Sequence, residues 1–327
     1  MTPLITVAAL SKTYRVPVKA EGLAASLRSL WDRKYKDVEA VKSVSFTISA
    51  GERVGFLGPN GAGKTTTLKM LAGLLYPSAG SVRVAGFQPQ DRAVAFLRSI
   101  TLVMGQKQQL LWDLPPRESF ALNRAMYGVD PKAYRETLDQ LVAMLRIEAI
   151  LEKPVRNLSL GERMKCELVA ALLHRPSVLF LDEPTIGLDV EMQVQVRKFI
   201  ADYNHETGAT VILTSHYMQD IAALTPRLLV IDQGSLRYDG GLTALAERVA
   251  PERRIVVKGG PVELAELGFV TVEGDQIATV RPEETNRKLS AVLERWPMVE
   301  VSVESPPLEE VMARYFREGA APKAAAT

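Results

Sequence analysis

The chain has 327 residues, of which 47% are hydrophobic and 24% are charged, and its formal net charge is +2. This length suits two domains, and so small a net charge argues against a protein that gathers nucleic acid through its overall field. The single cysteine, Cys166, excludes an intrachain disulfide, fits a reducing cytoplasmic compartment and is expected to serve core packing. We expect no signal peptide, because the N-terminus lacks a basic start followed by a long apolar run and a small-residue cleavage site. We expect no membrane-spanning helix, because no apolar run reaches roughly 18 residues.

The N-terminal region alternates between apolar and polar residues over 4–14 and 38–48, which predicts two strands. Between them, apolar residues recur at helical spacing among basic residues, at Leu23, Leu27, Leu30 and Trp31. We therefore predict an amphipathic helix inserted at about residues 17–34. Two interpretations stay open: the helix packs on its own domain, or it faces a membrane or a partner subunit.

The remaining sequence predicts a doubly wound α/β core with a helical insertion, followed by a smaller domain. Residues 53–75 follow the pattern strand, glycine-rich loop, helix, and residues 91–154 are mostly helical. Short apolar runs at 177–184 and 209–216 predict buried parallel strands. Beyond about residue 240, short alternating runs are interspersed with amphipathic helical patterns. We therefore predict a first domain over 1–240 and a small C-terminal α/β domain over 241–327.

The strongest motif is GPNGAGKT at residues 58–65, which fits G-x-x-x-x-G-K-[ST] and lies after an apolar strand and before a helix. The glycines let backbone N–H groups turn toward phosphate oxygens, and the helix N-terminus adds its positive end. We expect Lys64 to reach the β- and γ-phosphates, Thr65 to ligate Mg²⁺ and Thr66 to hold a phosphate. The predicted phosphate-binding residues are Gly58, Pro59, Asn60, Gly61, Ala62, Gly63, Lys64, Thr65 and Thr66.

Two carboxylates follow the apolar run VLFL, at Asp182 and Glu183. At the end of a buried strand, Asp182 is placed to hold Mg²⁺ through water. Glu183 is placed one residue further on, where a general base would orient and polarise an attacking water. The upstream phosphate loop argues against the alternative, an ordinary exposed Asp-Glu pair at a strand end.

Further polar residues are expected at the same sheet edge. His216 ends another buried strand, and its ring would hydrogen-bond a γ-phosphate there. Gln106 begins a polar loop after an apolar strand, and its amide would contact the metal and the attacking water. Gln108 and Gln109 are alternative candidates for that role.

These motifs, in this order, make residues 4–240 resemble the ATP-binding subunit of an ABC transporter. The phosphate loop is followed by Gln106, by LSLGE at 158–162, by the carboxylate strand, by GLD ending at Asp189, and by His216. The resemblance implies an α/β fold with a P-loop NTPase core of the ABC ATPase type, a helical subdomain and, added to it, the small C-terminal domain. It also implies ATP and Mg²⁺ as cofactors and ATP hydrolysis coupled to transport.

The segment LSLGE is a variant of the family's signature Leu-Ser-Gly-Gly-Gln. In this family the signature reaches the γ-phosphate of the nucleotide held by the other subunit, so the resemblance assigns Ser159 and Gly161 to that contact, and Asp189 to the nucleotide site. Leu160 replaces a glycine and Glu162 replaces the glutamine. The leucine reduces backbone freedom and the glutamate adds charge near phosphate, so we expect a working site with slower turnover.

The resemblance implies an aromatic residue that stacks on adenine. Tyr35 has the family's spacing to Lys64, whereas Tyr14 lies in the family's usual local context, LSKTY. The insertion separates these residues. We favour Tyr35 and keep Tyr14 as the alternative.

One chain carries both a phosphate loop and a signature, which serve opposite sides of one nucleotide in this family. The resemblance therefore implies a head-to-tail dimer of two copies, or of one copy and a related ATPase chain, with two sandwiched ATP molecules. We expect it to dock near residues 112–126 on a separate integral-membrane permease, peripheral on the inner face of the cell membrane, and to energise a bacterial exporter. We expect no nucleic-acid partner.

Two alternatives differ from the exporter hypothesis. The first is a soluble ABC ATPase acting in assembly or regulation without a channel, and the basic amphipathic insertion argues against it. The second is an ATP-binding regulator with little hydrolysis, and the presence of both Glu183 and His216 argues against that.

Overall fold

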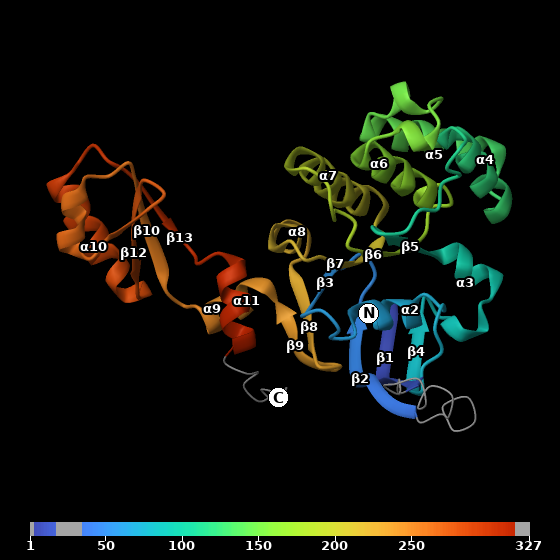
Figure 1. The fold of residues 1–327 in the computed structure, drawn as a ribbon, viewed down its shortest axis with the longest axis horizontal. Coiled ribbons are helices and arrows are strands. Elements are labelled where there is room, and N and C mark those ends of the chain that lie inside the picture. The colour runs from blue at the N-terminus through green and yellow to red at the C-terminus, as the bar shows by residue number, and fades with distance from the viewer. Residues whose placement is uncertain (1–2, 18–34, 318–327) are drawn as a thin grey trace, which may run out of the picture. The chain divides into compact units, whose positions relative to one another are not determined.

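The computed structural model describes residues 3–17 and 35–317, and the chain divides into two compact units, Met1–Asp239 and Gly240–Thr327 (Figure 1). The helix predicted within 17–34 lies outside the described residues, except that Pro17 ends a strand. Among the described helices, none has the length and apolar character needed to cross a membrane.

The first unit contains an antiparallel sheet in the order β2-β1-β4. Its strands are β1 (Ile5–Pro17), β2 (Tyr35–Ile48) and β4 (Ala79–Val84). The predicted N-terminal strands are confirmed, but both are longer than expected, because pairing continues to Pro17 opposite Tyr35. Alternate residues such as Ile5, Val7 and Ile48 are buried, so one face of this sheet packs into the core.

The second sheet of this unit has six strands in the order β5-β6-β7-β3-β8-β9. The pairs β5–β6, β6–β7, β7–β3 and β3–β8 are parallel, and their apolar residues are almost all buried. The predicted parallel strands are therefore confirmed. Since parallel strands end at the same sheet edge, the loops after β3, β6 and β7 converge there. The strands are β3 (Arg53–Leu57), β5 (Ile100–Met104), β6 (Val178–Asp182), β7 (Thr210–Thr214), β8 (Arg227–Asp232) and β9 (Ser235–Gly241).

Helices α4, α5 and α6 form the helical subdomain, in which α6 packs against both α4 and α5 (Figure 1). Cys166 lies on α6, is fully buried, and burial raises the pKa of its thiol to about 12, which confirms its expected packing role. The helices of the first unit are α2 (Lys64–Leu71), α3 (Val94–Ser99), α4 (Pro116–Tyr127), α5 (Pro131–Leu145), α6 (Leu160–Leu172), α7 (Val190–Thr207) and α8 (Met218–Leu224).

The second unit contains an antiparallel sheet in the order β11-β12-β10-β13. Along the chain, β10 is followed by the 3-10 helix η4, then by β11, β12, α10 and β13, which is the split βαβ arrangement of ferredoxin-like domains. The elements are α9 (Leu242–Val249), β10 (Arg253–Lys258), η4 (Val262–Leu267), β11 (Val270–Val272), β12 (Asp275–Val280), α10 (Pro282–Arg295), β13 (Glu300–Glu304) and α11 (Leu308–Arg317).

Candidate active site

The predicted phosphate loop connects β3 to α2, and glycine is required at several of its positions. Gly61 and Gly63 have φ angles of +78° and +107°, which residues with a Cβ atom rarely adopt. A Cβ at Gly63 would lie 2.4 Å from the carbonyl oxygen of Ala40, and one at Gly58 would lie 2.1 Å from that of Ile231. The loop is therefore pressed closely against β2 and the end of β8.

Lys64 supplies the positive charge of this loop. It is 7% exposed, and its Nζ atom donates hydrogen bonds to the carbonyl oxygens of Gly58 at 2.6 Å and Pro59 at 3.1 Å. Burial lowers the pKa of the Lys64 amine, and the nearby carboxylates of Glu183 and Asp182 act in the opposite direction. The adjoining cavity of about 160 Å³ is lined by Ala40, Asn60, Gly61, Ala62, Gly63, Lys64, Thr65, Thr66 and Glu183.

Asp182 ends β6 beside the start of α2. The Thr65 hydroxyl donates a hydrogen bond to Asp182 Oδ2 at 3.0 Å, so the residues predicted to share a metal are in contact. The Thr214 hydroxyl donates to Asp182 Oδ1 at 2.6 Å and accepts a bond from the backbone N–H of Glu183 at 3.1 Å. Thr214 is fully buried and therefore holds the carboxylate and the following backbone in place.

The predicted catalytic residues meet at Glu183. His216 Nε2 lies 2.7 Å from Glu183 Oε1, and the amide of Gln106 lies 3.5 Å from Oε2, at the long limit of a hydrogen bond. Glu183 has a φ angle of +56°, which is uncommon for a residue with a side chain and is typical of strained functional positions. Its side chain is 17% exposed, so it remains open to a small reactant such as water.

The alternative glutamines do not meet Glu183. The side chain of Gln109 donates to the carbonyl oxygen of Leu102 at 3.1 Å, and Gln108 is exposed. Of these residues, Gln106 is the one whose amide contacts the site.

The signature begins helix α6, with Ser159 as its N-cap. The Ser159 hydroxyl accepts a bond from the Glu162 N–H at 3.2 Å, and a Glu162 carboxylate oxygen accepts one from the Ser159 N–H at 2.8 Å. This capping box lowers the pKa of the Glu162 carboxyl chiefly through that backbone bond. The carboxylate expected to add charge near phosphate is thus engaged in closing the helix end. Leu160 is 43% exposed, whereas Gly161 is buried, and a Cβ there would lie 2.6 Å from Met192.

Asp189 is the N-cap of α7, and its side chain accepts a bond from the Met192 N–H at 2.8 Å. The signature contacts this region, since a Cβ at Gly187 would lie 3.1 Å from the side chain of Leu160. Neither Ser159 nor Gly161 lines the cavity at the phosphate loop, so within the described chain the two predicted nucleotide contacts remain apart.

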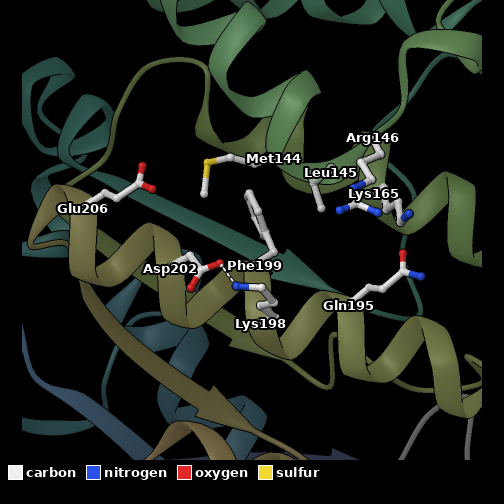
Figure 2. Close-up of a pocket in the computed structure, with 9 residues that line it drawn as sticks. All are labelled: Met144, Leu145, Arg146, Lys165, Gln195, Lys198, Phe199, Asp202 and Glu206. Carbon is white, nitrogen blue, oxygen red and sulfur yellow. Dashed lines mark hydrogen bonds and ion pairs between the residues drawn. The ribbon is translucent and has the colours of Figure 1, made fainter.

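A larger cavity of about 350 Å³ lies between α5, α6 and α7, and no predicted site residue lines it (Figure 2). Its floor contains Phe199, and Lys198 and Asp202 form an ion pair of 2.8 Å at its side. Burial, with the positive charge of Arg146 nearby, lowers the pKa of Lys165 at the opposite end. Neither the phosphate loop nor Asp182 or Glu183 lines this cavity.

Comparison with known proteins decides the family. The ABC transporter family matches residues 41–186. The chain is 34% identical over 220 residues to the ABC transporter ATP-binding protein NatA of Bacillus subtilis (strain 168), an alignment that covers 67% of this chain and 89% of NatA. The chain belongs to the ABC transporter ATP-binding proteins. It is an ATP-binding ABC ATPase with the P-loop NTPase fold expected from its sequence.

Other relatives agree with this assignment. The chain is 31% identical over 281 residues to the Nod factor export ATP-binding protein I of Rhizobium sp. (strain N33), covering 82% of this chain and 92% of that protein. Among solved structures, the ATP-binding subunit of an ABC transporter superposes with a TM-score of 0.61 at 23% identity, covering 75% of this chain and 92% of the other. The structural likeness independently supports the fold.

Two residues of this ABC ATPase site were missed by the sequence analysis, Thr214 and Asp220. Asp220 is fully buried and accepts hydrogen bonds from Ser215 Oγ at 2.6 Å, from Arg197 Nη1 at 2.7 Å and from the Thr185 hydroxyl. It therefore joins the loop after Glu183 to the loop that leads to His216. Thr214 could have been found from the pairing of the two parallel strands, which places it opposite Asp182. Asp220 could not, because an acidic residue on a short helix is not a distinctive sequence pattern.

The hairpin register separates the two candidate aromatic residues of the ABC ATPase. Ala40 of β2 lines the phosphate cavity. Tyr14 pairs with Val38, which lies roughly 7 Å from Ala40 along β2 at the usual rise per residue. Tyr35 lies at the far end of the hairpin, roughly 17 Å from Ala40 by the same rise, and is 45% exposed. The register favours Tyr14, the alternative that the sequence left open, over the preferred Tyr35.

Proposed function

We propose that this ABC ATPase energises a bacterial exporter as a head-to-tail dimer docked on a separate membrane subunit. The proposal rests on one observation: the chain holds both a phosphate loop and a capped signature, yet no signature residue lines the described phosphate cavity. A two-fold pair of copies, or one copy with a related ATPase chain, would bring each signature to the other's phosphate loop and complete two sites.

Export is supported by the names of two relatives. The Nod factor export ATP-binding protein I of Rhizobium is named for export, and the linearmycin resistance ATP-binding protein LnrL of Bacillus subtilis (strain 168), 32% identical over 217 residues, is named for resistance. Both names fit removal of a compound from a bacterial cell. We extend this direction of transport, without a substrate, to the present chain.

In the proposed reaction the oxygen of a water molecule attacks the γ-phosphorus of ATP, and the bond from that phosphorus to the β-phosphate oxygen breaks. Glu183 receives the water proton, and the products are ADP and phosphate. His216, at 2.7 Å from Glu183, orients its carboxylate, and Gln106 orients the water. Lys64, with Thr66 and the loop N–H groups, stabilises the charge that develops on the phosphates. From the partner subunit, the Ser159 hydroxyl and the Gly161 N–H would meet the γ-phosphate, with Asp189 fixing the adjacent helix.

The chemistry of the donor set at Thr65 and Asp182 fits Mg²⁺. This ion is usually bound through one or two carboxylates together with phosphate oxygens and water. The Thr65 hydroxyl lines the phosphate cavity and lies 3.0 Å from the Asp182 carboxylate. We propose that these residues hold it, with the side-chain oxygen of Gln106 nearby. When bound, the ion would neutralise charge on the β- and γ-phosphate oxygens.

The proposed docking surface for the permease is the segment at residues 112–126, which exposes large apolar side chains. Trp112 is 45% exposed, Leu122 is 46% exposed and Met126 is 68% exposed. We propose that these exposed apolar side chains contact the permease. This placement would keep the ATPase in the cytoplasm, peripheral on the inner face of the cell membrane.

The test is co-purification of tagged Glu183→Gln protein from a bacterial host that carries the neighbouring genes. Because loss of a general base lowers turnover by about 100-fold or more, ATP should hold the complex closed. In mild detergent with ATP and Mg²⁺, we expect a multi-span membrane protein to co-purify at near equal amount. The matched control is tagged Glu136→Gln protein, which carries an exposed change on α5 and still hydrolyses ATP. Recovery of a soluble dimer alone would contradict the exporter and support a role in assembly or regulation.

A further inference from the structure

One face of helix α6 holds the loop that follows Gln106. Arg163, Glu167 and Ala170 stand at positions i, i+4 and i+7, so they lie along one side of the helix. The Arg163 guanidinium lies 4.6 Å from the ring centre of Trp112, and the carbonyl oxygen of Ala170 accepts a bond from Asn123 at 3.2 Å. Glu167, between them, is the central contact.

Glu167 binds the backbone of the loop. Its side chain is buried, with the residue 4% exposed, and one carboxylate oxygen accepts bonds from the backbone N–H groups of Gln109 at 2.8 Å and Leu110 at 3.2 Å. Burial raises the pKa of this carboxyl, while the two N–H bonds and the Arg163 charge act in the opposite direction. Burying a carboxylate costs free energy unless its hydrogen bonds compensate for the lost water. No step of the proposed ATP hydrolysis uses the Glu167 carboxylate.

The same loop reaches the active site at its other end, where the Gln106 amide approaches Glu183 at 3.5 Å. The N-terminal end of helix α6 carries the signature, since Ser159 caps it and Gly161 lies in its first turn. The loop is further fixed where the Leu111 N–H donates to Ser119 Oγ at 2.9 Å. Glu167 therefore connects the loop that contacts Glu183 to the helix that begins at the signature.

We propose that Glu167 is a positioning residue that makes the Gln106 loop and the signature helix move as one body. A nucleotide that draws Gln106 toward its γ-phosphate then also places Ser159 and Gly161 for the nucleotide of the other subunit. This inference rests on the proposed head-to-tail dimer. It predicts that cutting the link impairs closure of the dimer while leaving ATP binding at the chain's own phosphate loop intact.

The first test measures ATP-dependent dimerisation in the Glu183→Gln background by sedimentation. Adding Glu167→Ala should weaken dimerisation about tenfold or more, because the N–H groups of Gln109 and Leu110 lose their acceptor. Affinity of the monomer for a fluorescent ATP analogue should stay within about twofold, because no residue of the phosphate loop is changed. Glu167→Gln keeps an acceptor oxygen and should restore dimerisation. Glu167→Asp, which keeps the charge but withdraws it from the loop, should behave like Glu167→Ala and replaces it if the alanine variant is unstable.

The second test is epistasis in steady-state hydrolysis. Glu167→Ala should lower kcat about tenfold with little change in KM, and should lower it no further when Gln106→Ala is already present. Equal losses in both backgrounds, or dimerisation of Glu167→Ala and Glu167→Asp like that of the parent, would overturn the proposal. If the Glu183→Gln parent itself fails to dimerise with ATP, the head-to-tail arrangement fails, and the inference about Glu167 falls with it.

Discussion

The phosphate loop and the signature, the two regions that we propose to bind nucleotide, are built in opposite ways. Lys64 is 7% exposed and bonded to carbonyl oxygens of its own loop, and the surrounding cavity is lined from the loop, from β2 and from Glu183. The signature instead places Ser159 and Leu160 on the surface, at a helix end closed by Glu162. One region is a formed cavity, and the other is a rigid exposed helix start.

This difference indicates where precision is required. The phosphate loop is shaped by positions such as Gly58 and Gly63, at which a Cβ would strike a carbonyl oxygen. The signature accommodates Leu160 in place of glycine because the leucine side chain is partly exposed and packs beside Gly187, which has no side chain. Its stability comes from the capping box, which either a glutamate or a glutamine can form. The altered signature is therefore a well-formed helix start.

The largest expected effect follows from Lys64→Met. Removing the buried charge should lower the affinity for ATP by about 100-fold, since we propose this amine as the loop's main electrostatic contact with the phosphates. Titration with a fluorescent nucleotide measures it. Lys69→Met, on the same helix and outside the cavity lining, is the matched control and should bind normally. Equal losses in both variants would show that the helix, not the contact, is at fault.

A smaller effect is expected for Ser159→Ala. The loss of the N-cap should cost about 1 kcal/mol in the free energy of unfolding, and the loss of the proposed phosphate contact should lower kcat about tenfold. Asp130→Ala removes the N-cap of α5, whose side chain accepts two backbone N–H bonds away from the site, whereas the Ser159 hydroxyl accepts one. Denaturant unfolding should give similar values for both variants, whereas steady-state turnover should fall for Ser159→Ala alone.

The adenine contact separates two tyrosines. Tyr14→Ala should raise the KM for ATP by roughly 2- to 10-fold, as expected for loss of one aromatic stacking contact, and Tyr35→Ala should leave it unchanged. The measurement is the ATP dependence of hydrolysis. A larger effect of Tyr35→Ala would restore the preference drawn from sequence spacing and would mean that the hairpin rearranges when nucleotide binds.

The smallest effect concerns the pH dependence of the capping box. The lowered pKa of Glu162 means that the folded protein favours the ionised carboxylate, so its stabilisation is present above the usual value of 4.5 and is lost as pH falls through the lower folded value. Relative to Glu162→Gln, we expect an advantage of roughly 0.5 kcal/mol at neutral pH, allowing for partial exposure. Denaturant unfolding should show this advantage shrinking below about pH 4.5. An advantage that grows with acid would contradict the assignment.

Much of this architecture was predictable from local pattern. The glycine loop, the apolar strand before Asp182 and the strand before His216 each carry their own signal, and parallel pairing then brings their ends together. Asp220 was not predictable, because its importance depends on three donors from elements far apart in the chain. Counting residues across an insertion favoured Tyr35, whereas the antiparallel register favours Tyr14.

The central claim is that one ATP site is formed from the phosphate loop of one copy and the signature of another. Its most direct test mixes Lys64→Met protein with Ser159→Arg protein, each inactive alone, and measures ATP hydrolysis. A mixed pair would contain one site with both defects and one intact site, so random pairing should restore about a quarter of the unmodified activity. Activity that stays at the sum of the separate variants, while both variants fold and cross-linking shows that mixed pairs form, would contradict the account.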